Sequence, residues 1–410
     1  MIIGVVVVVI GFMSWVFKTA PRNPSPRRWN EKKCSARENE LELKSKPLKT
    51  GLKYAVVGVG QVGRRILEAL CFRGERDTIA FDAFDNDWLR SSGLDFTFVK
   101  GDIRDLEALK AALQDVDVVY CTASVIRYYE RMDFQASFSE SINVQGMKNV
   151  VEACVFNGVK ILIQTSSSNV NVYDGAKNLI ISEDSPYVTR KTSPNHYGWS
   201  KAEQEQIVLK SNGRKSKNGV LRTGSVRPCS GIFGPRDGFI LQKYMNDSKI
   251  DFFFPEPVID WIYVDNVVWC HLLLEKQLLE ETRSGKDVWS GHVFCASNED
   301  PLSIENLHLM LREVHPIPIQ INYLPRNLLL GLSHIVEWIQ WFSSGNALAK
   351  SDLRLLTPAM TRLARIGYVL KSTKARDALG YRPLFTVDDA VKWTSKIWMR
   401  EQGPSSKKTK

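Results

Sequence analysis

The spacing between tyrosines and lysines is the first feature of this sequence that could support chemistry. Three of the 12 tyrosines stand four residues before a lysine, which places both side chains on one face of a helix. An ammonium group beside a phenol lowers the pKa of the phenol from about 10, so that a phenolate can accept the proton of an alcohol. The pairs that begin at Tyr173 and Tyr187 run into a glycine and a proline, whereas Tyr197 and Lys201 open a strong helical segment. Tyr197 and Lys201 are therefore the predicted catalytic pair.

A cluster of hydroxyl side chains follows an apolar run. The run KILIQT, residues 160–165, has the composition of a buried strand, and Ser166, Ser167 and Ser168 come directly after it. Open parallel sheets bind ligands at the carboxyl ends of their strands, so one of these hydroxyls is a candidate third member of the site. Turn formation is the alternative role for such a cluster.

A glycine-rich segment predicts a dinucleotide site. Gly58, Gly60 and Gly63 form a GxGxxG pattern between an apolar run and a helical segment. Glycines at these positions allow a tight turn and a close approach of the backbone to a pyrophosphate, which the N-terminus of the helix attracts. A glycine-rich turn without a ligand is the alternative.

Two aspartates after later apolar runs bear on the cofactor. Asp82 ends the run TIAFD, where a carboxylate suits the ribose hydroxyls of NAD and repels the 2′-phosphate of NADP. NAD is therefore the predicted cofactor, and Arg64 and Arg65, just after the last glycine, keep NADP as the alternative. Asp102 is a candidate for contacting the adenine amino group or for capping the helix that follows it.

The elements that must position these groups alternate between strand and helix. We expect strands at 54–59, 78–81, 96–99, 116–120, 160–165 and 219–226, and helices that end near 70 and span 105–113, 141–156 and 197–210. This alternation implies an α/β fold with a Rossmann-type, doubly wound parallel sheet. The predicted organisation is an NAD(P)-binding Rossmann domain over 51–227 and a smaller C-terminal substrate-binding lobe over 228–400, with strands that return to the core.

The net charge of +10 is concentrated near the two ends of the chain. Residues 18–53 hold 11 Lys and Arg against 4 Asp and Glu, and residues 401–410 hold 3 Lys against 1 Glu, which leaves a nearly neutral body. A nucleic-acid partner is therefore not expected. The 7 cysteines are scattered and form no C-x-x-C pair, so neither a disulfide framework nor a metal site is expected.

Both ends have features of a membrane protein. Residues 1–17 form an uncharged apolar run followed by positive charges, which predicts a membrane anchor helix with the catalytic domain in the cytosol. A basic linker covers 18–50. The Lys-rich tail, 401–410, ends in a KKTK sequence that resembles the di-lysine signal of endoplasmic reticulum membrane proteins, with a solvated tail as the alternative. The apolar and aromatic run over residues 328–342 predicts either a membrane-surface helix or a buried helix of the lobe.

Seven motifs occur in an order that resembles one enzyme family. GVGQVG, GDIRD, INVQGMKNVVEA, QTSSSNV, HYGWSK, SVRPCSGIFGPRD and DWIYVDNVV follow one another as in extended short-chain dehydrogenases. Over about residues 53–395 the chain resembles the 3β-hydroxysteroid dehydrogenase family, and within it the sterol-4α-carboxylate 3-dehydrogenases (decarboxylating). Two positions depart from the pattern, because Val57 stands where the family has its first loop glycine and Cys121 where it commonly has a histidine.

The resemblance implies NAD(P)-dependent oxidation of the 3β-hydroxyl of a sterol, after which a C4 carboxylate leaves as CO₂. It implies that Ser167 is the catalytic serine and that Asn143 supports a water chain to the lysine or packs its helix. Arg127 and Arg236 are candidates for holding the substrate carboxylate or for structural ion pairs. The implied cofactor-binding positions are Gly58, Gly60, Gln61, Val62, Gly63, Asp82, Asp102, Ile103, Thr122, Ala123, Tyr197, Lys201 and Pro228.

Two other functions stay open. A different extended-family oxidoreductase, such as a 3β-hydroxysteroid dehydrogenase/isomerase or a flavonoid- or aldehyde-type reductase, would use the same fold and the same pair. A non-catalytic nucleotide-sensing module would usually lack the tyrosine or the lysine, and both are present. A homodimer is a further expectation.

Overall fold

The computed structural model describes residues 49–402, apart from residues 86, 239, 253, 345, 346, 349 and 350. The predicted anchor over 1–17, the linker up to residue 48 and the KKTK end of the tail lie outside the described residues. Within the described part, none of the helices is both long enough and apolar enough to cross a membrane.

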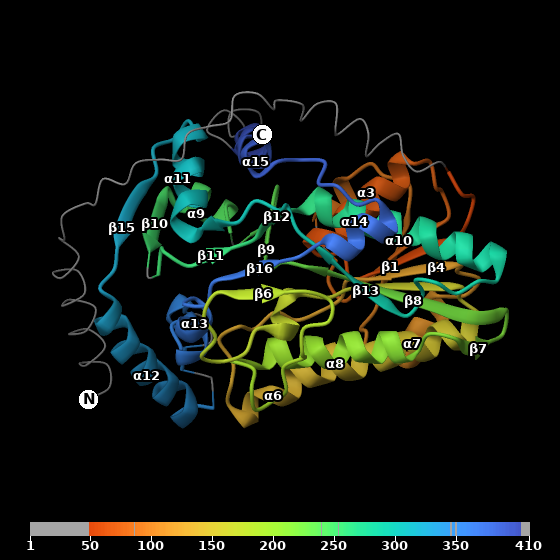
Figure 1. Ribbon diagram of the computed structural model, residues 1–410, viewed down its shortest axis with the longest axis horizontal. Helices are drawn as coiled ribbons and strands as arrows, with labels where there is room; N and C mark the ends of the chain where they lie inside the picture. Colours follow the sequence, from red (N-terminus) through yellow and green to blue (C-terminus); the bar gives the residue numbers. More distant parts are fainter. Residues whose placement is uncertain are drawn as a thin grey trace.

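A central parallel sheet organises the molecule (Figure 1). Seven strands run parallel in the order β13-β8-β5-β4-β1-β2-β3, and the short β7 pairs antiparallel with β8. This confirms the predicted Rossmann-type, doubly wound sheet. In sheet order the strands are β13 (His292–Ala296), β8 (Gly219–Pro228), β5 (Ile161–Thr165), β4 (Val118–Cys121), β1 (Tyr54–Val57), β2 (Thr78–Asp82) and β3 (Thr97–Lys100), with β7 at Arg214–Ser216.

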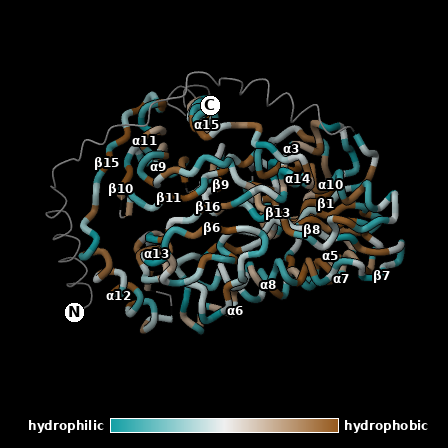
Figure 2. Tube along the Cα trace, in the orientation of Figure 1, coloured by the Kyte–Doolittle hydropathy of each residue, from teal (hydrophilic) through white to brown (hydrophobic). Residues whose placement is uncertain are grey.

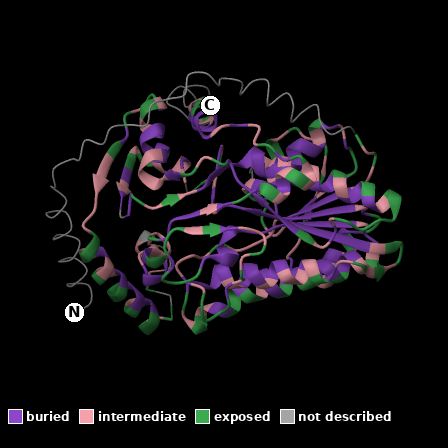
Figure 3. Ribbon diagram, in the orientation of Figure 1, coloured by how far each residue is buried: buried purple, intermediate pink, exposed green. Residues whose placement is uncertain are grey.

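Alternate residues of the buried strands pack into two separate cores. In β1, Tyr54 and Val56 belong to the cluster that includes α3 and α10, whereas Ala55 and Val57 belong to the cluster that includes α5 and α7. All four are buried, because helices cover both faces of the sheet (Figure 3). The helices of this part are α3 (Gln61–Phe72), α4 (Asp87–Ser91), α5 (Leu106–Ala112), α6 (Asp133–Ser139), the π-helix η1 (Glu140–Gln145), α7 (Gly146–Asn157), the 3₁₀ helix η2 (Ser168–Asn171), α8 (His196–Lys210) and α10 (Val264–Ser284).

Short strands and helices form a lobe beside the central sheet (Figure 1). The lobe has a β14-β11-β16-β6 sheet and the pairs β10–β15 and β12–β9. Its strands are β6 (Leu179–Ile181), β9 (Gly231–Phe233), β10 (Lys249–Phe252), β11 (Val258–Ile259), β12 (Trp261–Tyr263), β14 (Leu302–Ser303), β15 (Gln320–Tyr323) and β16 (Tyr368–Leu370). Its helices are α9 (Gln242–Asp247), α11 (Ile304–Val314), α12 (Arg326–Phe342), η3 (Asp352–Leu355), α13 (Pro358–Leu363) and α15 (Val387–Gln402), whereas α14 (Thr373–Leu379) packs against β13 and α10 of the central part.

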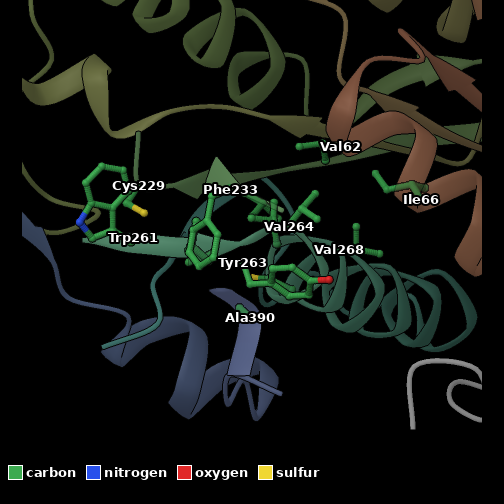
Figure 4. Packing of buried hydrophobic residues seen from close by; sticks show 14 of the residues in the cluster. Val62, Ile66, Cys229, Phe233, Trp261, Tyr263, Val264, Val268 and Ala390 are labelled. Atoms are coloured by element: carbon green, nitrogen blue, oxygen red, sulfur yellow. The ribbon is translucent and has the colours of Figure 1, made fainter. Parts of the chain in front are cut away.

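Aromatic side chains join the lobe to the Rossmann part. The rings of Phe233 in β9 and Tyr263 in β12 lie 6.0 Å apart. Figure 4 places both rings in one packed cluster with Val62 and Ile66 of α3 and Ala390 of α15. The glycine loop therefore sits where the two parts of the chain meet.

Helix α12 is a surface helix with one buried face. Leu329 and Val336 are buried, and Glu337 binds Arg131 of the Rossmann part (2.6 Å). The tube in Figure 2 shows apolar and polar residues alternating along this helix. The apolar side chains on its other face are exposed, namely Ile335, Trp338, Trp341 and Phe342.

Candidate active site

The three glycines after β1 have different steric roles. Gly58 has a φ of +90°, and a Cβ there would lie 2.4 Å from the Ala123 nitrogen. A Cβ on Gly63 would lie 2.0 Å from the Gly58 carbonyl oxygen, so this glycine lets α3 approach the strand. A Cβ on Gly60 would meet no atom within 4 Å. The backbone at Gly60 therefore faces open space at the N-terminus of α3, which fits a bound pyrophosphate.

Asp82 is held beside the glycine loop at the end of β2. Its Oδ2 accepts a hydrogen bond from the Val59 nitrogen (2.6 Å), and its Oδ1 accepts one from the Phe84 nitrogen (2.9 Å). Two donors of the neighbouring backbone thus fix the carboxylate at the edge of the loop. This is the position from which a carboxylate can reach ribose hydroxyls.

Arg64 and Arg65, which made NADP the alternative cofactor, differ in their surroundings. Arg65 pairs with Asp265 of α10 (2.6 Å) and also with Glu68, so its guanidinium is occupied within the protein. The guanidinium of Arg64 lies over the ring of Trp88, 4.9 Å from its centroid, on the side of the loop toward α4. Arg64 is therefore the one of the two that is placed near the Asp82 side of the site.

Asp102 does not cap the helix that follows it. Asp102 binds the Arg104 guanidinium (2.6 Å) and backbone nitrogen (2.8 Å), and these hydrogen bonds lower the pKa of Asp102. Asp105 is the N-cap of α5 and accepts a hydrogen bond from the Ala108 nitrogen (3.0 Å). The capping role predicted for Asp102 is therefore wrong, because α5 begins only at Leu106.

The other predicted cofactor positions surround the loop. Thr122 Oγ1 donates to the Gly58 carbonyl oxygen (2.6 Å), and the Ala123 nitrogen donates to the Val57 carbonyl oxygen (3.0 Å). Ile103 is buried in the core, where Asn149 Nδ2 binds its carbonyl oxygen (3.2 Å). The remaining positions lie in the first turn of α3 or at the end of β8: Gln61, Val62 and Pro228.

Tyr197 stands in the first turn of α8 and is held by two hydroxyl groups. Asn195 caps the helix through a hydrogen bond from the Gly198 nitrogen to its Oδ1 (3.0 Å), which fixes where α8 begins. The hydroxyls of Ser167 and Tyr128 hydrogen-bond to the Tyr197 phenol. The Tyr128 and Tyr197 rings meet edge-on with centroids 4.9 Å apart. The structure thus brings together Tyr197 and Ser167, the predicted tyrosine and serine.

Burial governs the ionisation of the predicted catalytic pair. Desolvation raises the pKa of Tyr197 to about 12, against the hydrogen bonds from the two hydroxyls. Desolvation also lowers the pKa of Lys201 to about 8. The Lys201 ammonium donates to the Thr165 carbonyl oxygen (2.7 Å) and to the Gln204 side-chain oxygen. The pKa of the phenol is thus raised and not lowered as expected, because desolvation outweighs the other contributions.

Asn143 occupies the π-helical turn η1, between α6 and α7. A π turn changes the direction of side chains relative to an α-helix and is frequent at functional sites. Asn143 is fully buried, its Oδ1 accepts a hydrogen bond from the Val125 nitrogen (2.8 Å), and its Nδ2 donates to Ser200 Oγ (2.9 Å). Its side chain therefore ties the segment after β4 to the residue that precedes Lys201.

A cavity of about 660 Å³ opens beside Tyr197. Its walls come from the segment after β4, the end of β5, the segment around β9, helix α9 and the segment from η3 to α13. Apolar and polar groups share the lining, which can therefore contact both faces of a mixed ligand. The lining residues are Gln61, Ile126, Tyr128, Tyr129, Ser166, Ser167, Tyr197, Cys229, Ser230, Ile232, Asp237, Gly238, Ile240, Lys243, Asn246, Asp247, Arg354, Leu355 and Met360.

The two arginines predicted to hold a substrate carboxylate lie outside this lining. Arg127 pairs with Glu130 (2.6 Å) and its guanidinium lies over the Phe138 ring, 4.0 Å from the centroid. Arg236 pairs with Glu401 (2.6 Å). Both therefore make the structural ion pairs that were their alternative role.

Three residues at the site were not singled out from the sequence. Tyr128 binds the Tyr197 phenol, Gln204 binds the Lys201 ammonium, and Arg354 lines the cavity. The sequence carried a weak signal for Gln204, because it follows Lys201 by three residues on one helix face. Tyr128 and Arg354 reach the site from segments far from Tyr197 along the chain, and no local pattern marks them.

Comparisons with known proteins agree with this geometry. The family model described as the 3-beta hydroxysteroid dehydrogenase/isomerase family matches residues 55–321. The chain is 30% identical over 305 residues to the 3beta-hydroxysteroid-dehydrogenase/decarboxylase isoform 2 of Arabidopsis thaliana, which covers 72% of this chain and 51% of that protein. It is 30% identical over 366 residues to the 3 beta-hydroxysteroid dehydrogenase type 7 of Homo sapiens, which covers 83% of this chain and 93% of that protein. The match therefore spans about half the length of the plant relative.

Solved structures share the fold. MoeE5 in complex with UDP-glucose and NAD superposes with a TM-score of 0.63 at 18% identity, covering 85% of this chain and 99% of that one. The UDP-glucuronic acid 4-epimerase from Bacillus cereus in complex with NAD gives 0.61 at 18% identity, covering 86% and 100%. From the family match over most of the described residues, together with the glycine loop and the tyrosine–lysine helix, the chain belongs to the 3-beta hydroxysteroid dehydrogenase/isomerase family, an extended short-chain dehydrogenase/reductase family that uses NAD(P).

Proposed function

We propose that this protein oxidises the 3β-hydroxyl of a sterol or steroid with NAD⁺, and that its substrate is a 4α-carboxysterol that loses CO₂ afterwards. The observation that carries the proposal is the Tyr197 phenol, bound by the Ser167 and Tyr128 hydroxyls, at the wall of the 660 Å³ cavity beside the glycine loop. The names of the relatives, a 3β-hydroxysteroid dehydrogenase and a dehydrogenase/decarboxylase, support the reaction.

Each residue of the site has a separate role in removing the proton from an alcohol. Bound NAD⁺ supplies the hydride acceptor. Ser167 is placed to hold the alcohol oxygen, and Tyr197 Oη takes its proton. Because desolvation raises the pKa of Tyr197 to about 12, the phenolate needs the hydroxyl donors of Ser167 and Tyr128 and a nearby positive charge to form. Lys201 lies four residues after Tyr197 on the same helix, and its buried ammonium is held by a hydrogen bond. We assign to this ammonium the positive charge that the phenolate needs.

The lining of the cavity suits an apolar ligand with one anionic group. Ile126, Ile232 and Ile240 supply apolar walls, and Leu355 and Met360 supply another. Arg354, in the same segment as these last two, has its guanidinium 5.7 Å from the centroid of the Tyr129 ring. An arginine at the cavity wall can bind a carboxylate in bidentate fashion. Oxidation at C3 turns a 4-carboxysterol into a β-keto acid, which loses CO₂ because the resulting enolate is delocalised onto the new carbonyl.

Parallel assays test the reaction and the substrate. The full-length protein would receive NAD⁺ with either a 4α-carboxy-3β-hydroxysterol or the same sterol without the carboxylate, and NADH and CO₂ would be followed. We expect NADH and CO₂ together from the first substrate, and their loss in Tyr197→Phe. NADH without CO₂ would move the substrate to a simple 3β-hydroxysteroid, and turnover only of a ketone or aldehyde with NADPH would replace the proposed function by a reductase.

We assign Arg354 to binding the carboxylate of the substrate, and this role can be tested separately. Arg354→Gln should raise KM for the carboxylated sterol about tenfold, or more, and leave KM for the uncarboxylated sterol unchanged, because a charge-assisted hydrogen bond is lost only with the first. Arg127→Gln is the matched control, since Arg127 pairs with Glu130 away from the cavity lining. Equal changes for both sterols would contradict the role of Arg354.

We also propose that the protein associates with the endoplasmic reticulum membrane, with its catalytic domain in the cytosol, through residues 1–17 and the outer face of α12. The supporting observation is that Trp338, Trp341 and Phe342 are exposed together on a helix whose opposite face is buried. Exposed aromatic groups of this kind insert at the boundary between lipid headgroups and acyl chains.

Flotation with phosphatidylcholine vesicles tests the contribution of α12. The double change Trp338→Ser and Trp341→Ser should reduce the fraction of full-length protein that floats. Phe156→Ser, which removes an exposed aromatic side chain from α7, is the control. Equal flotation of all three proteins would remove α12 from the membrane contact and leave the N-terminal segment as the remaining candidate. Microscopy of the tagged protein in cells, with and without residues 407–410, tests the compartment.

A further inference from the structure

A buried glutamine holds the lysine of the predicted catalytic pair. Lys201 is 2% exposed, and its ammonium donates to the Thr165 carbonyl oxygen (2.7 Å) and to the side-chain oxygen of Gln204. Gln204 lies three residues further along α8 and is fully buried. Its carboxamide therefore turns back along the helix and meets the lysine inside the protein.

The orientation of the Gln204 carboxamide is fixed by its other partners. Its Nε2 donates to the Ala123 carbonyl oxygen (3.2 Å), and its Oε1 accepts a second hydrogen bond, from Gln164 Nε2 (3.1 Å). Gln164 is in turn bound through its Oε1 by the hydroxyl of Ser225 (3.3 Å). Rotation of the Gln204 amide would set its NH₂ group against two donors and its oxygen against a carbonyl. The network thus forces an acceptor to face the Lys201 ammonium.

We propose that Gln204 is a positioning residue that holds the Lys201 ammonium in place and stabilises its charged form, and that Gln164 fixes Gln204 for this role. The proposal rests on the oxidoreductase function proposed above, because it concerns the lysine of that reaction. It also gives a reason for the two glutamines in the core between β5 and α8, where an apolar pair would otherwise be expected.

The charges around Lys201 explain why a neutral acceptor matters. Desolvation lowers the pKa of Lys201 to about 8, and Cys121 and Glu205 oppose this shift. Glu205 is itself bound by the Arg227 guanidinium (2.5 Å), which reduces what its carboxylate can offer the ammonium. Tyr197 lies on the same face of α8 as Lys201 and is uncharged as a phenol. The hydrogen-bond acceptors of Thr165 and Gln204 therefore add to Cys121 and Glu205 in offsetting the loss of water around the ammonium.

The second acceptor is also anchored. Thr165, whose carbonyl oxygen binds Lys201, has its hydroxyl bound to His271 Nε2 of α10 (2.8 Å). Desolvation lowers the pKa of His271 to about 4, so this imidazole adds no charge near neutral pH. Lys201 is therefore held between one acceptor on β5 and one on α8, and loss of either leaves the ammonium less stabilised.

Two substitutions at Gln204 have opposite expected effects. Gln204→Met keeps the side-chain length but removes the acceptor, and it should lower the pKa of Lys201 by about one pH unit. Gln204→Glu places a carboxylate beside the ammonium and should raise that pKa by about one unit or more. Gln164→Leu removes only the partner of Gln204 and should lower the pKa by a smaller amount. Gln206→Met, on the same helix but bound to the Ala202 carbonyl oxygen, is the matched control.

The measurement is carbon-13 NMR of the full-length protein labelled at the lysine ε carbons, titrated with pH, with Lys201→Met to assign the signal. NADH fluorescence gives cofactor affinity for each variant, and steady-state assays give kcat and KM. We expect kcat to fall roughly tenfold in Gln204→Met while the sterol KM stays constant, since Gln204 does not line the cavity.

The NMR titration needs no turnover, so it separates this inference from the proposed function. Opposite pKa changes in Gln204→Met and Gln204→Glu, with none in Gln206→Met, support the positioning role even if no sterol is oxidised. An unchanged Lys201 pKa in both Gln204 variants would overturn it and leave Gln204 a packing residue. If Gln204→Met does not fold, Gln164→Leu still decides, because a packing role of Gln204 predicts no change of the Lys201 pKa in that variant.

Discussion

The surroundings of Lys201 and the outer face of α12 are built in opposite ways. Around the lysine, polar side chains are fully buried and bound by partners from other strands and helices, as Asn143, Gln204 and Arg227 are. On α12, large apolar side chains such as Trp338, 66% exposed, point away from the protein. Burying a polar group without a hydrogen-bond partner costs free energy, so the side chains around Lys201 are held in one arrangement. The exposed side chains of α12 are only weakly constrained.

The two regions differ in how firmly the protein positions their side chains. In the Rossmann part, hydrogen bonds between distant segments fix side chains to a fraction of an ångström, which a proton transfer requires. At the end of the lobe, one helix face and two ion pairs, Arg131–Glu337 and Arg326–Glu256, fix the position of α12, and its other face is exposed.

The largest expected difference concerns two ion pairs. Arg227 and Glu205 are both fully buried, so Arg227→Met leaves an unpaired carboxylate in the core and should cost about 3–5 kcal/mol of unfolding free energy. Arg131→Met breaks the partly exposed pair with Glu337 and should cost about 1 kcal/mol or less. Urea denaturation followed by circular dichroism measures both. Equal costs would show that the buried network is no more constrained than the surface of α12.

The second prediction concerns acid stability and two buried histidines. Desolvation lowers the pKa of His271, in the Rossmann part, and of His308, in the lobe, to about 4 from 6.5. Between pH 6.5 and 4 the unfolded chain therefore binds more protons than the folded one. The stability that each neutral histidine contributes is complete above pH 6.5, is lost as the pH falls to 4, and amounts to roughly 3 kcal/mol.

Urea midpoints measured from pH 7 to 4 check this, with His271→Gln and His308→Gln each expected to flatten the profile. If the two parts unfold together, both variants flatten it equally. A His308→Gln effect seen only by lobe tryptophan fluorescence would instead mean that the lobe unfolds separately. A profile that neither variant changes would contradict the assigned pKa directions.

The third prediction concerns cofactor choice, with Asp82 and Asp102 as the matched pair. Asp82→Asn removes the carboxylate held at the glycine loop, and should lower kcat/KM for NAD⁺ about tenfold while raising it for NADP⁺. Asp102→Asn changes a carboxylate that is already paired with Arg104, and should have a smaller effect. An unchanged NAD⁺ to NADP⁺ ratio in Asp82→Asn would contradict the role of Asp82 in cofactor choice.

Much of the fold follows from the sequence because it depends on local patterns. Each of the runs YAVV and KILIQT and the glycine loop is defined by residues that are neighbours along the chain, and each becomes the expected element. Tyr197 and Ser167 meet because both stand at ends of such elements. The lobe is harder, since strands of two or three residues such as β11 have no period to recognise.

The direction of the Lys201 ammonium could not be predicted in the same way. Spacing places Lys201 and Tyr197 on one helix face, but the oxygens that bind the lysine belong to Thr165, on a strand, and to Gln204. Asp105 and not Asp102 caps α5, because Asp102 binds Arg104 instead. The direction of the Lys201 ammonium depends on contacts between distant segments, which are not visible along the chain.

The smallest expected effect compares the two faces of α12 itself. Trp338→Ser changes a side chain that makes few contacts within the described chain, so the unfolding free energy should change by less than about 0.5 kcal/mol. Leu329→Ala, on the buried face of the same helix, should cost about 2 kcal/mol or more because it leaves a cavity. Thermal and urea unfolding of the two variants give the comparison directly. A cost for Trp338→Ser near that of Leu329→Ala would mean that the outer face is covered in the intact protein, which would turn the proposed membrane contact into a contact within the chain or with a second copy of it.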